Sequence, residues 1–351
     1  MGTLFKNMAS AGEALGEFLG GCLHVLFCLR EPETILWQGI AMHQPWMARV
    51  ALFLGAQADR YAKLRFMTPL LEAAQARDRD ICQLLLERGA SPDCRNAAGR
   101  TPLHEAIALN DLATAATLIA GGADIDAQDD QDKTPLHIAT KLKPAVPDTV
   151  LFLLGAGASS NIPENQTGYT PLHLAAGTPE LTEAVRAMIV VGADINAEAK
   201  RNGETPLHDA ICYGNPAAAR ALIEAGANLN SRDFRGRTPL FRACKYSGEK
   251  TVRLLLEHDA DPNIASNKGH TPLMMATLNR RHKVISLLLW HGAKADAADK
   301  DGHTALDHLL TEKQVRIARD LRRAQERLGS SALRHGDIRR PHPPRPRGPS
   351  L

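Results

Sequence analysis

The chain has 351 residues, which is long enough for two ordinary domains or for one extended repeat array. Hydrophobic residues make up 44% of it and aromatic residues only 4%, a composition that favours short, closely packed helices over a large aromatic core. The net charge of +3 argues against a strong polyanion binder when the chain is taken as a whole.

The N-terminal region contains an apolar stretch at residues 18–29, which His24 interrupts and Glu13 and Glu17 precede. A secretory signal ends at a small-residue cleavage site, and a membrane-spanning helix needs about 20 apolar residues. The stretch meets neither condition, so we expect no signal, no membrane span and an intracellular protein, cytoplasmic or nuclear. Residues 1–33 are predicted to form a helical cap over the first repeat, which otherwise exposes an apolar face.

One multi-residue motif recurs along the chain. A Thr-Pro-Leu triplet occurs seven times and a Thr-Ala-Leu variant follows, at intervals of 33, 33, 36, 35, 33, 33 and 33 residues. The motifs begin at Thr68, Thr101, Thr134, Thr170, Thr205, Thr238, Thr271 and Thr304. Four of them read Thr-Pro-Leu-His, with an alanine two residues after the histidine. The chain thereby resembles the ankyrin-repeat family, whose signature is Thr-Pro-Leu-His-x-Ala at a period of about 33 residues.

The residue types that recur in each repeat can be explained by local structural requirements. The hydroxyl of Thr205 can cap a helix N-terminus, and Pro206 fits the first helical turn because its missing N–H is not needed there. Leu207 and Ala210 then lie on one helix face. After a second helix, Gly226 supplies the left-handed conformation that ends it. The pattern predicts two short helices and a loop in each repeat.

The resemblance implies an all-α repeat solenoid, in which each repeat contributes helix, turn, helix and a projecting β-hairpin finger. The array is predicted to cover residues 34–328 in about nine units, of which the outer two are degenerate. The units begin near residues 34, 68, 101, 134, 170, 205, 238, 271 and 304.

The C-terminal end changes in composition. Residues 304–328 begin as a repeat and continue into a predicted capping helix with an apolar stripe and a basic outer side. Residues 329–351 are rich in Pro and Arg, so we expect a disordered basic tail. Residues 313–351 carry 11 Lys and Arg against three Asp and Glu, which is +8; the remaining 31 basic and 36 acidic side chains give −5. One Arg-x-x-Pro-x-x-Pro match at residues 340–346 leaves a ligand role for the tail open.

Catalytic and metal-binding patterns are missing from the sequence. It contains no Gly-x-Ser-x-Gly, Gly-rich phosphate loop or His-Glu-x-x-His, and its six cysteines form no Cys-x-x-Cys pair. Four motif histidines stand one per repeat, too far apart to share an ion whose ligands lie within about 2.3 Å, so each is expected to bond to loop backbone. These histidines are His104, His137, His173 and His208. We therefore predict a non-enzymatic protein with no cofactor, no metal and no small-molecule substrate.

Some positions of each repeat are not needed for the fold, so the residues found there should indicate what kind of partner the protein binds. In the ankyrin family, partner proteins bind along a concave surface formed by finger tips and the exposed side of the first helix. From Lys200 to Lys283 these positions hold cations and aromatic side chains, as interface centres do, although a solvated charged face remains the plain alternative. The predicted partner-binding residues are Lys200, Arg201, Tyr213, Phe234, Arg235, Arg237, Arg242, Lys245, Tyr246, Lys268, His270 and Asn279.

The sequence thus favours a protein-interaction scaffold or adaptor, monomeric on its own, which binds an acidic or phosphorylated segment of a partner protein. The alternative is a binder of nucleic acid or of an acidic surface that uses the basic C-terminal helix and tail. The net acidic body and the lack of aromatic residues in the tail disfavour nucleic acid.

Overall fold

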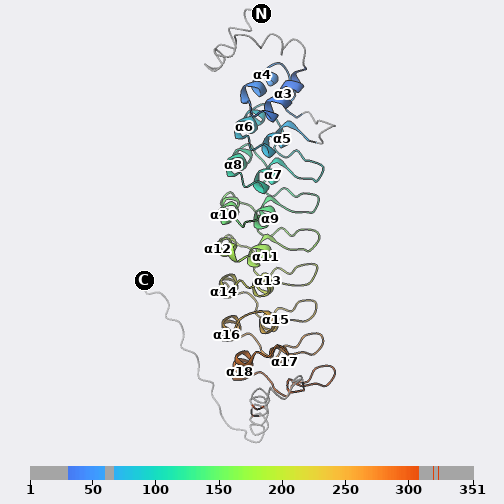
Figure 1. The fold of residues 1–351 in the computed structure, drawn as a ribbon, viewed down its shortest axis with the longest axis vertical. Helices are drawn as coiled ribbons and strands as arrows, with labels where there is room; N and C mark the ends of the chain where they lie inside the picture. The colour runs from blue at the N-terminus through green and yellow to red at the C-terminus, as the bar shows by residue number, and fades with distance from the viewer. Residues whose placement is uncertain (1–30, 60–66, 308–318, 320–322, 324–351) are drawn as a thin grey trace, which may run out of the picture. The chain divides into compact units, whose positions relative to one another are not determined.

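The computed structural model describes residues 31–59, 67–307, 319 and 323, and within these ranges short helices alternate with loops (Figure 1). The chain divides into two compact units. The first unit is Met1–Asp194 with Ala199–Arg201, and the second is Ile195–Glu198 with Asn202–Leu351.

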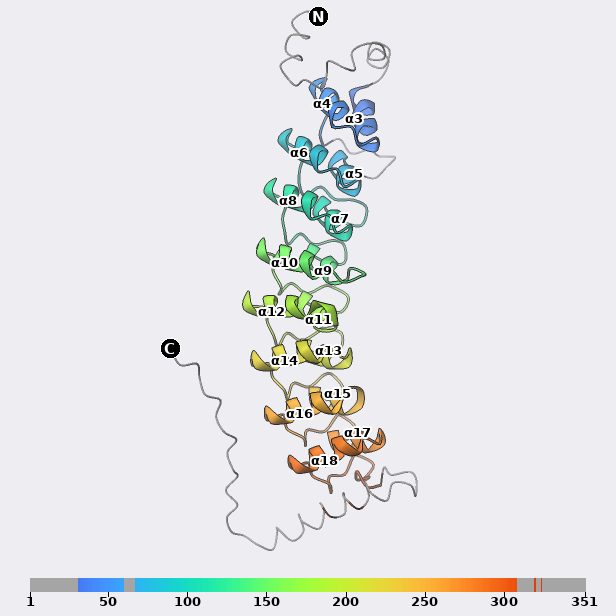
Figure 2. The same ribbon diagram turned by 60° about the vertical axis from the view of Figure 1, so that its left-hand side comes forward.

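The first unit stacks helix pairs in chain order. First helices pack on first helices, as α5, α7, α9 and α11 do in succession, and second helices pack on second helices, as α6 does on α8 (Figure 2). The pairs are α3 (Pro32–Ala41) and α4 (Pro45–Phe53), α5 (Pro69–Gln75) and α6 (Arg79–Glu87), α7 (Pro102–Ala108) and α8 (Leu112–Ala120), α9 (Pro135–Thr140) and α10 (Pro147–Gly155), and α11 (Pro171–Ala176) and α12 (Thr182–Val190), the last two joined by the 3-10 turn η2 (Pro179–Leu181).

The second unit repeats the same arrangement. Helix α15 packs between α13 and α17, and α16 packs between α14 and α18. Its helices are α13 (Pro206–Cys212), α14 (Pro216–Glu224), α15 (Pro239–Tyr246), α16 (Glu249–Glu257), α17 (Pro272–Leu278) and α18 (His282–Trp290). The predicted all-helical repeat solenoid is confirmed as a fold class.

Each first helix of the motif repeats begins as the sequence predicts, at the Thr-Pro pair. Proline occupies the first helical turn, and the threonine hydroxyl accepts the backbone N–H of the third helical residue, as Thr238 does from Phe241 at 3.2 Å. The following Leu240 and Ala243 are buried on the inner face of α15. Helix starts are therefore fixed by residues within one turn, which is why they can be recognised in the sequence.

The motif histidines connect each repeat to the next loop, as the sequence interpretation expected. The backbone N–H of Thr134 donates to Nδ1 of His137 at 3.2 Å, which leaves the proton on Nε2. That Nε2 donates to the carbonyl of Tyr169, the residue just before the next motif, at 3.1 Å. His104 and His208 make the same bonds to the carbonyls of Lys133 and Arg237. These three imidazoles thus join a helix start to the following loop.

The loops that precede the Thr-Pro-Leu motifs, here called finger loops, are tight turns closed by backbone bonds, such as the one from the N–H of Asp233 to the carbonyl of Arg237 at 3.0 Å, and by a side chain. In the loop that ends at Arg237, Oδ1 of Asp233 accepts the backbone N–H of Arg235 at 2.9 Å and of Arg237 at 2.8 Å. Within the described ranges the secondary structure includes an isolated bridge between Ala298 and Thr304 but no strand. The expectation of β-hairpin fingers is not confirmed.

Neighbouring finger loops are bonded to each other through their backbones. In the second unit, the N–H of Phe234 donates to the carbonyl of Asn202 at 2.8 Å, and the N–H of Asn267 donates to the carbonyl of Arg235 at 2.9 Å. The side-chain amide of Asn267 also donates to the carbonyl of Phe234 at 2.8 Å. The spacing of side chains on successive loops is therefore set by the main chain.

Two glycines of the second unit test this loop-to-loop contact. Gly226, with φ +89°, ends α14 in open space, whereas Gly236, with φ +72°, lies where an added Cβ would come within 2.7 Å of the backbone nitrogen of Asn267. Alanine at Gly226 should cost about 1–2 kcal/mol for the left-handed backbone alone. We expect Gly236→Ala to cost clearly more, because the next loop must also move. Urea unfolding of the two variants measures the difference, and equal losses would contradict the contact.

Several expectations fall partly or wholly outside the described residues. The helical cap at 1–33, except for its last three residues, the end of the capping helix up to residue 328 and the tail 329–351 lie outside the described residues. The stretch predicted as a degenerate first repeat begins with the helix pair α3 and α4. None of the helices in the described ranges has the length and apolarity that a bilayer crossing requires.

Candidate functional site

A cleft of about 520 Å³ opens in the second unit between two finger loops and helix α15. One wall comes from the loop before Thr238, the other from the loop before Thr271, and the floor comes from α15 and α17. Its lining residues are Phe234, Arg235, Arg237, Phe241, Arg242, Lys245, Tyr246, Ser266, Asn267, Lys268, His270 and Met275.

Eight of the twelve residues predicted from the sequence line this cleft. The other four lie elsewhere: Lys200 and Arg201 belong to the first unit, Tyr213 is 65% exposed at the end of α13, and the amide of Asn279 donates to the carbonyl of Met275 at 2.7 Å. The structure therefore gathers most of the predicted set but not all of it.

Arg242 is not the surface cation that the sequence pattern suggested. Its side chain is buried and ion-paired with Glu204 and with Asp233, the latter at 2.9 Å. Arg237, which is half-buried, binds the same Asp233 oxygen through Nε at 2.7 Å. Two guanidinium groups and two carboxylates thus form a buried ion cluster beneath the cleft, and their charges balance.

This buried ion cluster also holds the floor of the cleft in place. Asp233 closes its own loop with one carboxylate oxygen and binds both arginines with the other. Nη1 of Arg242 donates to the sulfur of Cys212 at 3.1 Å, and burial raises the pKa of that thiol to about 12, so it stays neutral. Glu204, which lies 38 positions before Arg242, shows no sign of this role in the sequence alone.

Three exposed cations remain at the rim of the cleft. Arg235 lies on one finger loop, Lys268 on the next, and Lys245 near the end of α15. Among the described residues none of the three has an ion-pair partner, although the ammonium group of Lys245 lies 4.8 Å from the ring centre of Tyr246. The accessible charge of the cleft is therefore positive.

Apolar surface lies between these cations. Phe234 is 60% exposed and Tyr246 is 48% exposed, whereas Phe241 is buried in the floor and Met275 is half-buried beside it. The sequence interpretation missed Phe241 and Met275, which occupy or follow the histidine position of their motifs. A partner side chain placed here would contact two aromatic rings and remain within reach of positive charge.

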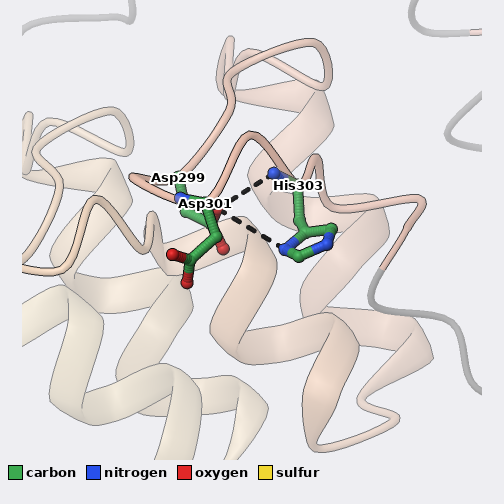
Figure 3. Close-up of side chains that lie close together, drawn as sticks. All are labelled: Asp299, Asp301 and His303. Atoms are coloured by element: carbon green, nitrogen blue, oxygen red, sulfur yellow. Dashed lines mark hydrogen bonds and ion pairs between the residues drawn. The ribbon is translucent and has the colours of Figure 1, made fainter.

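One group of possible metal ligands occurs in the described residues, in the finger loop that begins after α18 (Figure 3). It consists of Asp299, Asp301 and His303. Oδ1 of Asp299 already accepts the backbone N–H groups of Asp301 at 3.0 Å and His303 at 2.9 Å. This is the same turn closure that Asp233 makes, so the arrangement is accounted for by the loop itself.

Comparison with family models matches the chain to the family described as ankyrin repeats (3 copies). Overlapping matches cover residues 41–129, 108–198, 136–233, 180–266 and 260–326. A search of curated proteins gives no match. With the family matches extending over residues 41–326 and the stacked helix pairs beneath them, the chain belongs to the ankyrin-repeat family.

Proposed function

We propose that this chain is a non-enzymatic scaffold or adaptor, which binds a partner protein through the cleft between the finger loops and α15. Ankyrin repeats are in general protein–protein interaction modules. The observation that carries the proposal is the combination of three exposed, unbalanced cations with exposed aromatic rings around one opening. Arginine and aromatic residues are enriched at the centres of protein interfaces.

The charge of the cleft selects the kind of partner. Because the two inner arginines are neutralised by Asp233 and Glu204, the surface charge comes from Arg235, Lys245 and Lys268. An acidic or phosphorylated segment of a protein complements this charge, and such complementarity speeds encounter and excludes other partners. Intracellular proteins, cytoplasmic or nuclear, are the proposed source of the segment.

The full-length triple variant Arg235→Glu, Lys245→Glu and Lys268→Glu is expected to lose capture of the partner, because three attractions become repulsions. Affinity capture with quantitative mass spectrometry compares it with the wild type. Arg220→Glu, Lys250→Glu and Lys294→Glu form the matched control, since these exposed residues lie away from the cleft and change the charge equally. Far-UV circular dichroism should be the same for all three proteins. Partners retained by the cleft variant to the same extent as by the control would refute the proposal.

A second candidate is a binder of nucleic acid that uses the basic stretch 313–351. The observation that favours it is the local charge of +8 against −5 for the rest of the chain. Filter binding over a salt series distinguishes the two, because phosphate contacts give a steep dependence on salt. Nucleic-acid binding that the cleft variant leaves unchanged supports this second candidate.

A further inference from the structure

The arginines best suited to hold a phosphate group are already used inside the cleft. A phosphate is bound most strongly by forked guanidinium groups that converge on it. Arg237 and Arg242 do converge, but on one carboxylate oxygen of Asp233, at 2.7 and 2.9 Å, and Arg242 also binds Glu204. An incoming phosphate would have to displace buried carboxylates from both arginines.

The cations that remain accessible are spread over three elements. Arg235 and Lys268 are on successive finger loops, which the bond from Asn267 to the carbonyl of Arg235 holds in register, and Lys245 is on α15. Two of the three are lysines, which bind as separate point charges and not as forks. His270, the remaining basic side chain of the rim, lies 3.5 Å from the carboxylate of Asp299. Such a distribution matches several separate carboxylates better than one dianion.

The dimensions and the apolar walls indicate a short segment. A volume of about 520 Å³ is within the usual range of small-ligand pockets, about 300–1,000 Å³, and so admits one or two side chains but not a folded domain. Phe234 and Tyr246 form the exposed apolar walls, and Met275 contributes a flexible thioether that adapts to the shape of a neighbour. One apolar side chain of the segment fits between them.

We infer that the cleft takes an unphosphorylated acidic segment of a partner protein, with one apolar side chain in the cleft and Asp or Glu residues on either side of it that contact Arg235, Lys245 and Lys268 separately. This inference rests on the proposed function and narrows it, because it assigns the charge of the segment to carboxylates. It also makes Glu204 and Asp233 the residues that determine specificity for carboxylate over phosphate, because their ion pairs keep two arginines from binding a phosphate group.

The test uses the full-length protein and a soluble peptide library as the probe. The library has a central Leu or Phe and flanking positions randomised over Gly, Ser, Asp, Glu and phosphoserine. We expect enrichment of Asp and Glu at two or more flanking positions. With the selected peptide, Arg235→Ala, Lys245→Ala and Lys268→Ala should each weaken binding by a comparable factor, on the order of 2- to 5-fold, as exposed ion pairs do. Arg235→Lys should bind as the wild type does, because a single carboxylate does not need the guanidinium fork.

Each other outcome has a distinct meaning. Selection of phosphoserine at one position, with Arg235→Lys losing binding, overturns the inference but leaves a partner-binding cleft. Enrichment that none of the three alanine variants changes overturns both the inference and the proposed function. Competition by a short single-stranded oligothymidylate, lost in the same variants, shows that the cleft binds nucleic acid and also overturns the inference. A library without any selected sequence counts against it as well.

Discussion

Replacing Arg242 with methionine is expected to lower the free energy of unfolding by roughly 3–5 kcal/mol, the usual cost of breaking a buried ion pair from one side. The buried carboxylate of Glu204 then loses its nearest cation, since Nη2 of Arg237 is 4.0 Å away, and Asp233 loses one of two guanidinium partners. Methionine fills much of the space of the arginine stem, so the loss of stability comes from the missing charge and not from a large cavity. Urea unfolding at neutral pH measures it.

The matched control is Arg235→Met, on the exposed rim of the same cleft. This change should alter the free energy of unfolding by no more than about 0.5 kcal/mol, as surface substitutions usually do. The double variant Arg242→Met and Glu204→Met should recover part of the loss, because the buried carboxylate has been removed together with its partner. Equal stability of Arg242→Met and Arg235→Met would show that the buried ion cluster contributes little.

Acidification below about pH 6.5 is expected to destabilise the protein through its motif histidines. Burial lowers the pKa of His104, His137 and His208, and that of His137 to about 4. Between the unfolded and folded pKa values only the unfolded chain takes up the proton. Stability is therefore complete above about pH 6.5 and falls by up to about 1.4 kcal/mol per pH unit for each such histidine, until the pH reaches the folded pKa.

His137→Met isolates the contribution of one histidine. Methionine already occupies this position in another repeat, where Sδ of Met274 accepts the N–H of Thr271 at 3.3 Å. The variant should lose about 1 kcal/mol at neutral pH with the bond to the carbonyl of Tyr169, yet show a shallower decline between about pH 6 and pH 5. Unfolding curves over this range test it, and an unchanged slope would argue against the buried neutral imidazole.

The pH range of that experiment is chosen to avoid the carboxylates. Burial would raise the pKa of Glu164, but hydrogen bonds from Thr167 and Lys141 and nearby positive charge outweigh it and lower the pKa. The stability from this group is present above its unfolded pKa and is lost as the pH falls through the lower, folded value. Measurements above about pH 5 therefore report mainly on histidine.

The helices could be predicted because their signals are local. A threonine, a proline and two apolar residues within one turn specify where α13 or α15 begins, and the repeat period specifies what packs on it. The β-hairpin geometry came only from the family resemblance; in the structure the loops are tight turns, closed by backbone bonds and by the side chain of Asp233 and its equivalents. Backbone pairing between loops depends on the stack, so a single repeat does not reveal it.

The types of residue that line the cleft could be predicted from the sequence, but the directions in which their side chains point could not. Rim residues such as Arg235 and Lys245 follow from the positions that the repeat leaves free. Arg242 occupies a comparable position, yet it turns inward because it pairs with Glu204 and Asp233 on the two preceding finger loops. Neither partner is near Arg242 in the sequence, since Glu204 lies 38 positions before it and Asp233 nine. Which of two nearby arginines faces solvent is decided by such distant carboxylates.

The bond from a motif histidine to the following finger loop limits how far that loop can move. In the two repeats that form the cleft, this position holds Phe241 and Met274, whose side chains cannot donate to the loop that follows. The finger loops that end at His270 and His303 therefore lack the histidine hydrogen bond. The loops that end at Lys133, Tyr169 and Arg237 have it. Of the two loops that form the walls of the cleft, the one that ends at His270 lacks this bond and can adjust to a bound segment, whereas the one that ends at Arg237 is held by His208.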